Sequence, residues 1–450
     1  MTFTTRPELR GTFGAVSSTH WLASAVGMSI LEKGHTAFDA AVATGFVLQV
    51  VEPHLNGPGG EVPIIITPAG ADAPIVISGQ GPSPAKATVA YFRSLGLDII
   101  PGTGLLAACI PGAFGAWLTL LRDHGTAELE DVLAPAIYYA EVGHPLVPRI
   151  ANTIASMREL FETHWPTSAQ VYLPNGDAPQ AGKLFRNRQI AAMYQKIIDH
   201  SRSGRTREAR IEAALDFWYR GPVAERIARF CADEDVWDVS GRHHRGLITA
   251  DDMAAYKPPI EKPVSVTYGN HEIFKCGAWS QGPVLLQMLQ ILQGTDIADL
   301  DPLGADFVHL VIETAKLAMA DREAWYGDNP DVPLEALLSP QYANERRALI
   351  GKEASRDMRP GSPEGRSPNL PPLRTVGTIP QPDVAGKEKA ADTYRSLPND
   401  GQGEPVLTQE GAQRGDTVQV SAVDRWGNMV SATPSGGWFQ SSPVIPELGF

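Results

Sequence analysis

Apolar residues near the start of the chain follow a helical spacing twice in succession. They recur three and four positions apart from Leu22 to Leu31, and Gly34 is placed to end this first helix. Thr36 then precedes Asp39 by three positions, which is the arrangement of a capping box at the start of a second helix. Residues 37–51 are apolar almost all round, so we expect the second helix to be buried between layers.

Shorter apolar runs predict β-strands around these helices. A short strand, "GAVSS" (14–18), precedes the first helix, while "EVPIIITP" (61–68) and "APIVISG" (73–79) follow the second. Adjacent strands packed under buried helices indicate a layered α/β domain. From about residue 107 to residue 351 the pattern is mostly helical, with a strand-like interruption at 262–276.

The pattern changes between residues 352 and 414. This stretch holds nine prolines, many Gly, Ser and charged residues, and almost no apolar periodicity. Such a segment buries too little surface to offset its ordering entropy, so we predict a flexible tether over residues 352–416. The chain then divides into a core at 1–351, this tether, and an ordered C-terminal part at 417–450.

The C-terminal part begins as a pair of strands. Apolar and polar residues alternate from Val418 to Ala422, as in a strand with one buried face. Gly427 and Asn428 then predict a tight turn into a second strand, "MVSAT".

Composition narrows the possible partners. The 450-residue chain is 43% hydrophobic and 20% charged, and its net charge of −13 argues against nucleic acid or an anionic membrane as the main partner. Three widely spaced cysteines indicate neither a disulfide framework nor a zinc site. No apolar run is long enough to span a bilayer and the first residues lack the features of a signal peptide, so we expect a cytoplasmic protein.

Several sequence motifs with known chemistry are absent from this chain or incomplete in it. The glycine-rich "NGPGGE" (56–61) lacks the lysine of a P-loop and the spacing of a dinucleotide-binding turn, and the prolines of "GQGPSP" (79–84) remove backbone donors. No GxSxG elbow is present. The eleven histidines include no HExxH motif, and we expect them to lie at the surface. The sequence therefore predicts no metal and no organic cofactor.

Thr417 is the residue whose context points to catalysis. A cut between Asp416 and Thr417 would give Thr417 both a hydroxyl nucleophile and a free α-amine with an ordinary pKa of about 8, which together make a nucleophile–base pair. Such a residue must begin a buried strand, so that the site is rigid, and must follow a flexible segment, so that the new terminus can move away. The alternative is an ordinary edge hairpin after a loop, because threonine is common in strands.

Long segments of the chain resemble the γ-glutamyltransferase (γ-glutamyltranspeptidase) family of N-terminal-nucleophile hydrolases. They cover nearly the whole sequence and are "GAVSSTHWLASAVGMSILEKGHTAFDAAVATGFVLQVVEPHLNGPGG", "IPGAFGAW", "APAIYYAEVGHPL", "GPVLLQMLQIL", "VHLVIETAKLAMADREAWYGD" and "DTVQVSAVDRWGNMVS". Together these segments are specific, although no single one is. The chain is most similar to a divergent branch that includes acylases.

The resemblance implies a four-layer αββα sandwich of the α+β type with largely helical additions. It also implies a precursor that cuts itself between Asp416 and Thr417, so that residues 1–416 form a large subunit paired with a small one. Thr417 then attacks a γ-glutamyl amide such as glutathione, and the acyl group passes to water or an amine. Ser435 stands where the family has a threonine whose hydroxyl supports the nucleophile, and a serine can make the same hydrogen bond.

Three positions depart from the family pattern. Gln80 replaces an arginine that clamps the α-carboxylate of the glutamyl group, and a neutral amide is a poor substitute for a bidentate cation. Gly437 lies where the family has an asparagine that helps to hold the donor, and Gln419 replaces a histidine two residues after the nucleophile. The alternative is therefore an acylase acting on a non-glutamyl amide, as in the cephalosporin-acylase relatives.

The C-terminal end is a further departure. The family's small subunit continues beyond the position of Phe450, and that part normally carries the oxyanion hole. We therefore expect an incomplete small subunit and a 450-residue chain that is inactive by itself, since loss of one oxyanion donor costs about 10²–10³ in rate. Another alternative is a protein that keeps the fold uncut and acts as a scaffold.

Overall fold

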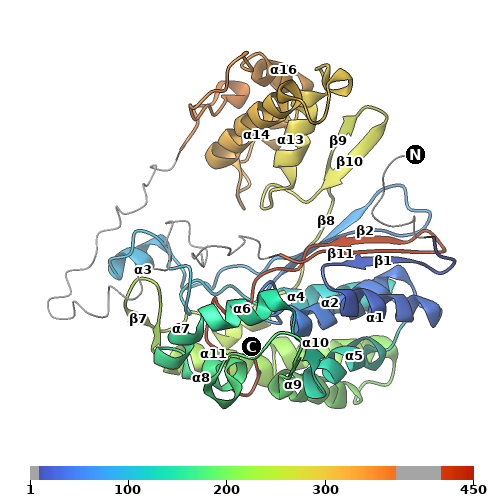
Figure 1. Cartoon of the computed structure of the whole chain (residues 1–450), viewed down its shortest axis with the longest axis vertical. Helices are drawn as coiled ribbons and strands as arrows, with labels where there is room; N and C mark the ends of the chain where they lie inside the picture. The colour runs from blue at the N-terminus through green and yellow to red at the C-terminus, as the bar shows by residue number, and fades with distance from the viewer. Residues whose placement is uncertain (1–9, 371–416) are drawn as a thin grey trace. The chain divides into compact units, whose positions relative to one another are not determined.

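The computed structural model of the protein describes residues 10–370 and 417–450. The chain divides into two compact units. The first contains Met1–Asp72, Ile77–Ile260 and Thr375–Phe450, and the second contains Ala73–Val76 and Glu261–Arg374. Figure 1 shows the elements of both units.

A six-stranded sheet runs through the first unit. Its strands lie in the order β1 (Gly14–Ser18), β11 (Val420–Asp424), β12 (Met429–Ala432), β2 (Val62–Thr67), β3 (Ile75–Gly79) and β8 (Ile260–Glu261). Strands β1, β11, β12 and β2 pair antiparallel. The C-terminal hairpin of β11 and β12 therefore lies in the middle of the sheet, and the alternative of an edge hairpin is wrong.

Helices α1 (Trp21–Glu32) and α2 (Ala37–Val51) cover one face of this sheet (Figure 1). Every residue of α2 is buried, as its apolar sequence predicts, and the helix packs against β11 and β12. The predicted capping box is present, with Thr36 and Asp39 bonded to each other's backbone N–H groups. Gly34 follows the end of α1 with φ of 92°, a conformation that glycine adopts without strain.

Two buried carboxylates tie helix α2 to its surroundings. Asp39 accepts the backbone N–H groups of Thr126 and Ala127 at 2.8 and 2.9 Å. Asp424, the last residue of β11, accepts the N–H of Ala37 at 2.9 Å. Because the first N–H groups of a helix lack partners inside the helix and carry partial positive charge, Asp424 joins the C-terminal hairpin to the start of α2.

The remaining elements of the first unit are mostly helical, as the sequence predicts. They are α3 (Val89–Ser94), α4 (Ala113–His124), α5 (Leu129–Glu141), β4 (His144–Pro145), α6 (Pro148–Ser156), α7 (Arg158–Thr163), α8 (Pro166–Tyr172), η1 (Pro174–Gly176), β5 (Leu184–Phe185), α9 (Arg188–Ser201), α10 (Arg207–Tyr219), α11 (Pro222–Asp233), β6 (Val236–Trp237), β7 (His243–His244) and α12 (Ala250–Ala255). Helices α4 and α5 pack against α2, and α9 and α10 pack against those two. The helices on this side of the sheet therefore form two ranks (Figure 1).

The second unit begins with the strand-like interruption that the sequence predicts. Its elements are β9 (Val264–Tyr268), β10 (His271–Lys275), α13 (Gly282–Leu292), η2 (Ile297–Asp299), α14 (Ala305–Trp325), α15 (Leu334–Leu337), α16 (Pro340–Arg347) and η3 (Pro363–Gly365). A buried ion pair between Asp321 and Arg346, 3.0 Å apart, links α14 to α16. The backbone N–H of Gly361 donates to the same carboxylate at 2.6 Å, so the segment around η3 is bound to this unit.

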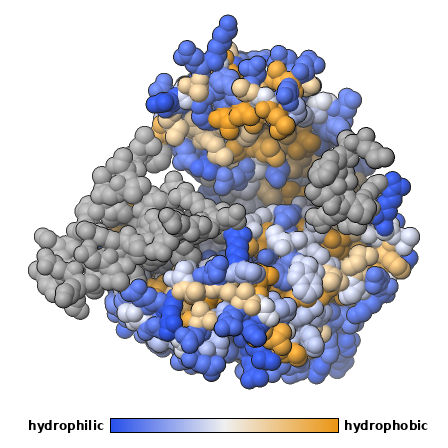
Figure 2. All heavy atoms as spheres, in the orientation of Figure 1, coloured by the Kyte–Doolittle hydropathy of each residue, from blue (hydrophilic) through white to orange (hydrophobic). Residues whose placement is uncertain are grey.

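Helix α14 has apolar side chains on an exposed face. Val308, Ile312 and Met319 recur at helical spacing and are 40–52% exposed, and Figure 2 shows hydrophobic surface on this unit. Leu317 and Asp321 lie on the buried face. Helix α14 therefore exposes apolar side chains on one face, while its buried face includes the carboxylates of Glu313 and Asp321.

The mixture of helices with an antiparallel sheet confirms the predicted α+β class. The divisions of the chain after residues 351 and 416 stay predictions. Asp416 and residues 371–416 of the predicted tether lie outside the described residues.

The expectation that the histidines lie at the surface is wrong for four of them. His20, His54, His144 and His244 are at most 9% exposed. His244 is bonded through Nδ1 to the buried carboxylate of Asp238 at 2.6 Å. Burial lowers the pKa of His54 to about 3 and the pKa of His144 to about 4, so both rings are neutral in the folded protein near pH 7.

We expect the protein to lose stability on acidification below about pH 6.5. The unfolded chain binds a proton on each histidine near that pH, whereas folded His54 and His144 bind one only near pH 3 and 4. Between these limits protons favour the unfolded chain, by about 1.4 kcal/mol per pH unit for each histidine. Thermal unfolding between about pH 7.5 and pH 4.5 measures the effect.

Two variants test whether His54 causes this pH dependence of stability. His54→Gln should lose less stability than the wild type over the same range, whatever its absolute stability. His271→Gln, at an exposed histidine, should keep the wild-type slope. Equal slopes for His54→Gln and the wild type would contradict the assignment to His54.

Candidate active site

Thr417 lies just ahead of β11, within the central part of the sheet. It forms an antiparallel bridge with Ser435, and the N–H of Val418 donates to the carbonyl of Pro434 at 3.0 Å. These contacts continue the register that pairs β11 with β12. Because Val418 is fully buried, the backbone at the start of the strand is held firmly next to Thr417.

The structure brings together the two residues predicted to be catalytic. The hydroxyl oxygens of Thr417 and Ser435 are 3.2 Å apart, a hydrogen bond in which either can donate. Thr417 is exposed and Ser435 is half-buried, so both hydroxyls are accessible from one side. The arrangement fits a nucleophile held by a neighbouring hydroxyl, and the catalytic roles of both residues stay predictions.

Glu61 lies on the other side of Ser435. The two residues exchange both backbone hydrogen bonds, at 2.9 and 3.0 Å, and continue the register of β12 with β2. Residues directly opposite each other in antiparallel strands point to the same face of the sheet. Thr417, Ser435 and Glu61 therefore form one row of side chains across three strands, which we call the Thr417–Glu61 row.

Sequence reasoning missed Glu61 as a site residue. It appears in the sequence only as the residue after a glycine-rich turn, and no motif marks it. The signal that identifies it is the strand register, which joins residues far apart in the chain.

The glycines of "NGPGG" pack directly against the segment that carries Ser435. A Cβ on Gly57 would overlap the carbonyl of Gly437, and a Cβ on Gly60 would overlap the carbonyl of Ser435 and lie 2.5 Å from that of Gly436. These glycines are therefore needed for close backbone approach. This contact explains a motif for which the sequence offered no chemistry.

Gly437 is held in a conformation that suits glycine. Its φ is 63°, and a Cβ there would lie 2.6 Å from the backbone N of Gly60. An asparagine, which the family pattern has at this position, would be strained here. The glycine at position 437, where the family pattern has asparagine, therefore suits the local backbone conformation and the close approach of Gly60.

Gln80 is exposed directly after β3. The preceding residue, Gly79, packs against the carbonyl of Val62, the first residue of β2, so Gln80 lies near the end of β2 that carries Glu61. Within the described residues the Gln80 side chain makes no hydrogen bond. At this position the chain therefore has a neutral amide where the family pattern has a cation, and a role of Gln80 in substrate binding stays a prediction.

Gln419 organises the polar face of the sheet beside Thr417. Its amide nitrogen lies 3.2 Å from the Ser431 hydroxyl and 3.3 Å from the Ser421 hydroxyl, and its amide oxygen accepts from Thr433 at 3.1 Å. An amide can donate and accept at the same time without carrying charge. The replacement of histidine by Gln419 therefore removes a titratable group two residues from Thr417 and keeps a hydrogen-bonded support.

A small apolar cavity lies next to Gly437. Its volume is about 80 Å³, and it is lined by Gly59 and Cys109 with a mainly apolar set of side chains that includes Leu105, Trp438, Phe439, Ile445 and Phe450. Cys109 is exposed at the surface, yet partial enclosure of its thiol raises the thiol pKa, and the negative charge of Glu61 raises it further. A raised pKa disfavours the thiolate, which is the reactive form of a cysteine.

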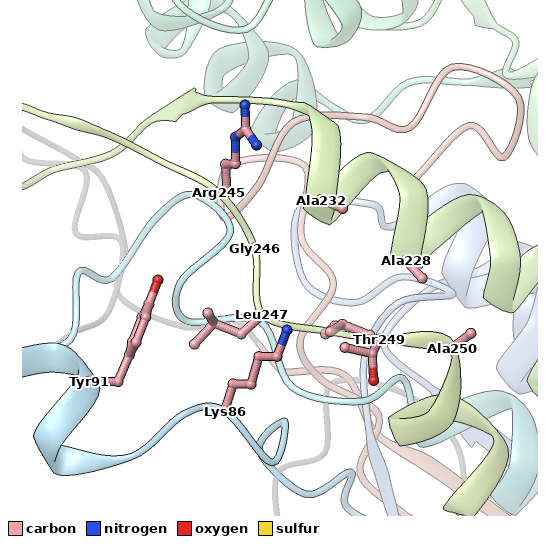
Figure 3. A pocket seen from close by; sticks show the side chains of 10 residues that line it. Lys86, Tyr91, Ala228, Ala232, Arg245, Gly246, Leu247, Thr249 and Ala250 are labelled. Carbon is pink, nitrogen blue, oxygen red and sulfur yellow. The ribbon is translucent and has the colours of Figure 1, made fainter.

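Another cavity, of about 480 Å³, lies elsewhere in the first unit. Figure 3 shows Lys86 and Tyr91 on one side of it and the segment from Arg245 to Ala250 on the other. None of the predicted site residues lines this cavity. We therefore do not assign it to the reaction.

Within residues 10–370 and 417–450, no three His, Cys, Asp or Glu side chains are placed to hold a metal ion together. The same ranges contain no helix long and apolar enough to cross a membrane.

Comparison with known proteins identifies the family. The family model for gamma-glutamyltranspeptidase matches residues 23–450. The chain belongs to the gamma-glutamyltranspeptidase family. Members of this family are processed into a large and a small subunit and act on amides, and the resemblance seen in the sequence is thereby confirmed.

Individual relatives in the gamma-glutamyltranspeptidase family include both hydrolases and acylases. The glutathione hydrolase-like YwrD proenzyme of Bacillus subtilis is 32% identical over 346 residues, which are 76% of this chain and 61% of that protein. The acylase ACY 1 proenzyme of Pseudomonas sp. (strain SE83) is 32% identical over 98% of this chain and 68% of its own length. The chain thus spans about two thirds of the length of these relatives.

A solved structure is also similar over the whole of this chain. The structure of LmbA2991HD is 49% identical, with a TM-score of 0.88, and the match covers all of this chain and 72% of that one. A cephalosporin acylase from Bacillus halodurans matches with a TM-score of 0.74 at 25% identity. These neighbours confirm the N-terminal-nucleophile hydrolase fold.

Gly60→Ala should disrupt the position of Ser435. The added Cβ meets backbone carbonyls that cannot turn away, so we expect a loss of about 1–3 kcal/mol in the free energy of unfolding. Gly327→Ala is the control, because a Cβ there meets nothing within 4 Å and should change stability by less than about 0.5 kcal/mol. Denaturant unfolding of both variants measures the difference, and equal stabilities would contradict the close backbone approach.

Proposed function

We propose that the protein is an autoprocessing amidase or acyltransferase in which Thr417 becomes the N-terminal nucleophile. The observation that carries this proposal is the hydrogen bond of 3.2 Å between the hydroxyls of Thr417 and Ser435, made where Thr417 enters the centre of the sheet. An exposed hydroxyl on a rigid backbone beside a second hydroxyl suits nucleophilic catalysis. Family membership supports the same reaction class.

The proposed reaction has two steps. After cleavage between Asp416 and Thr417, the Thr417 hydroxyl attacks the amide carbonyl of the donor, and its proton passes to the Thr417 α-amine. The amine gives that proton to the leaving nitrogen as the amide bond breaks, which leaves an acyl-threonine ester. Water or an acceptor amine then resolves the ester and restores the hydroxyl. Ser435 orients the Thr417 oxygen in both steps.

The donor has two candidate classes. A γ-glutamyl amide such as glutathione follows from the family pattern, and a non-glutamyl acyl amide follows from the departures in this chain. Gln80 cannot form the bidentate charged contact that an α-carboxylate favours, and the cavity beside Gly437 is mainly apolar. These two observations favour the non-glutamyl amide.

Mass spectrometry tests the nucleophile. The wild-type protein should separate into two fragments with the second beginning at Thr417, whereas Thr417→Ala should stay as one chain and Thr417→Ser should still be cut. Ser435→Ala should slow the cut about 2–12-fold, in line with the loss of one neutral hydrogen bond to the nucleophile, and Ser435→Thr should restore it. A wild-type chain that stays uncut and forms no acyl adduct would favour the scaffold alternative.

Gln80→Arg tests the donor class. A charged hydrogen bond to a carboxylate contributes about 1.5–3 kcal/mol, so the variant should raise kcat/KM for γ-glutamyl p-nitroanilide by about 10–150-fold. Gln80→Met, of similar size and without charge, should not raise it. Were the wild type already to prefer this substrate over uncharged acyl anilides, the non-glutamyl assignment would be overturned.

A further inference from the structure

The small cavity beside Gly437 indicates what kind of acyl group the site accepts. We propose that this cavity is a specificity pocket that holds a short, uncharged aliphatic acyl chain of the donor. The inference rests on the proposed function of Thr417 as the nucleophile, and it names the substrate class of the same site. Such a chain differs from a γ-glutamyl group, whose end carries an amine and a carboxylate.

The cavity begins where the Thr417–Glu61 row ends. Gly437, which lines it, follows Ser435 by two residues, so their Cα atoms are at most about 7 Å apart. Gly59, on the opposing segment, precedes Glu61 by two residues and also lines the cavity. A reacting carbonyl carbon lies about 3–3.5 Å from the attacking Thr417 oxygen, so an acyl chain of a few bonds reaches the cavity from there.

The lining residues differ in their exposure to solvent. Gly59 and Gly437 are half-buried and Cys109 is exposed, so these three residues form the mouth of the cavity. Ile227 and Val444 are 4% and 1% exposed, so they form its inner end. A chain that enters at the mouth therefore ends against packed side chains, and a pocket of this form selects substrates by chain length.

The walls of the cavity suit an uncharged chain. Among the described residues, no acidic side chain, lysine, arginine or histidine lines it. The indole N–H of Trp438, which does line it, already donates to the carbonyl of Leu55 at 2.8 Å. A charged group would lose its hydration here without gaining a charged partner, whereas each buried CH₂ group strengthens binding about fourfold.

Negative charge at the mouth disfavours an anionic chain. A Cβ on Gly436 would overlap the carboxylate oxygen Oε2 of Glu61, so this carboxylate lies against the turn between Ser435 and Gly437. Partial enclosure and then the charge of Glu61 raise the pKa of the Cys109 thiol, so the negative potential extends to the mouth. An acyl chain that ends in a carboxylate would meet this potential as it enters.

The volume of the cavity limits the length of the chain. Its volume of about 80 Å³ is about half of the 150 Å³ of an engineered apolar cavity that binds benzene, so it has room for roughly three carbons. The carbonyl carbon and one or two further carbons lie between Thr417 and the mouth. Acyl chains of about four to six carbons therefore fit.

Acyl p-nitroanilides of increasing chain length test the pocket. The wild-type kcat/KM should rise about 15–60-fold from the acetyl to the hexanoyl compound, at about fourfold for each of two or three CH₂ groups that enter the cavity, and should fall for the octanoyl compound. Glutaryl p-nitroanilide, which ends in a carboxylate, should be at least about tenfold worse than the hexanoyl compound. Equal values for all chain lengths, or a preference for the glutaryl compound, would overturn the proposal.

Two substitutions change the pocket in opposite directions. Gly59→Ala adds a methyl group 3.2 Å from the Phe450 ring, so it should lower the hexanoyl-to-acetyl ratio of kcat/KM at least about fourfold. Ile227→Ala removes three carbons from the inner end, so the octanoyl compound should become better than the hexanoyl compound. Ile227→Val removes one carbon at less risk to folding and should shift the same ratio by a smaller factor. The control is Ile211→Ala, at a fully buried isoleucine of α10 outside the cavity lining, which should keep the wild-type ratios.

Mass spectrometry of each protein first establishes that the cut before Thr417 has occurred. A cut wild type that hydrolyses the series, with Ile227 variants that keep its chain-length optimum, overturns the pocket and leaves the nucleophile intact. If the wild type hydrolyses none of the compounds, the proposed function fails. Calorimetric binding of hexanamide and acetamide then decides the pocket by itself: tighter binding of hexanamide that Gly59→Ala weakens supports it, and equal affinities overturn it.

Discussion

The close backbone contact between residues 57–60 and residues 435–437 sets the geometry of the candidate site. Two chain segments far apart in sequence meet with room only for glycine. This contact places Ser435 beside Glu61 on one side, and the strand pairing places it beside Thr417 on the other. A side chain at Gly60 would separate these strands, so the hydroxyl pair at Thr417 depends on residues that take no part in the chemistry.

Much of the local structure follows from the sequence because it depends on short-range physics. The capping box at Thr36, the all-round burial of residues 37–51 and the turn at Gly427 are properties of neighbouring residues, and each is present. The candidate nucleophile could also be predicted, since Thr417 follows a compositional break and precedes an alternating strand. The pairing of Thr417 with Ser435 was implied by family resemblance, and the structure supplies its geometry.

The rest could not be predicted, because it depends on which distant segments pair. The sheet order places the C-terminal hairpin between β1 and β2, and no local pattern specifies those neighbours. Glu61 joins the site only through this pairing. The expectation that the histidines lie at the surface is wrong for a similar reason. His54 has a polar side chain, yet it is buried because the segment after α2 packs beneath the C-terminal residues. The structure therefore adds two kinds of information: which distant strands pair, and which polar side chains become buried when distant segments pack together.

The central position of the hairpin has a consequence for how the protein is made. A cut before Thr417 would leave two interior strands of the sheet, β11 and β12, on a separate polypeptide, with β1 on one side and β2 on the other. Residues 1–416 alone would expose two unpaired strand edges at that gap, and such edges invite aggregation. The hairpin also supplies Asp424 to the start of α2. Assembly from two separately synthesised pieces is therefore disfavoured, and the intact chain is the species that must fold.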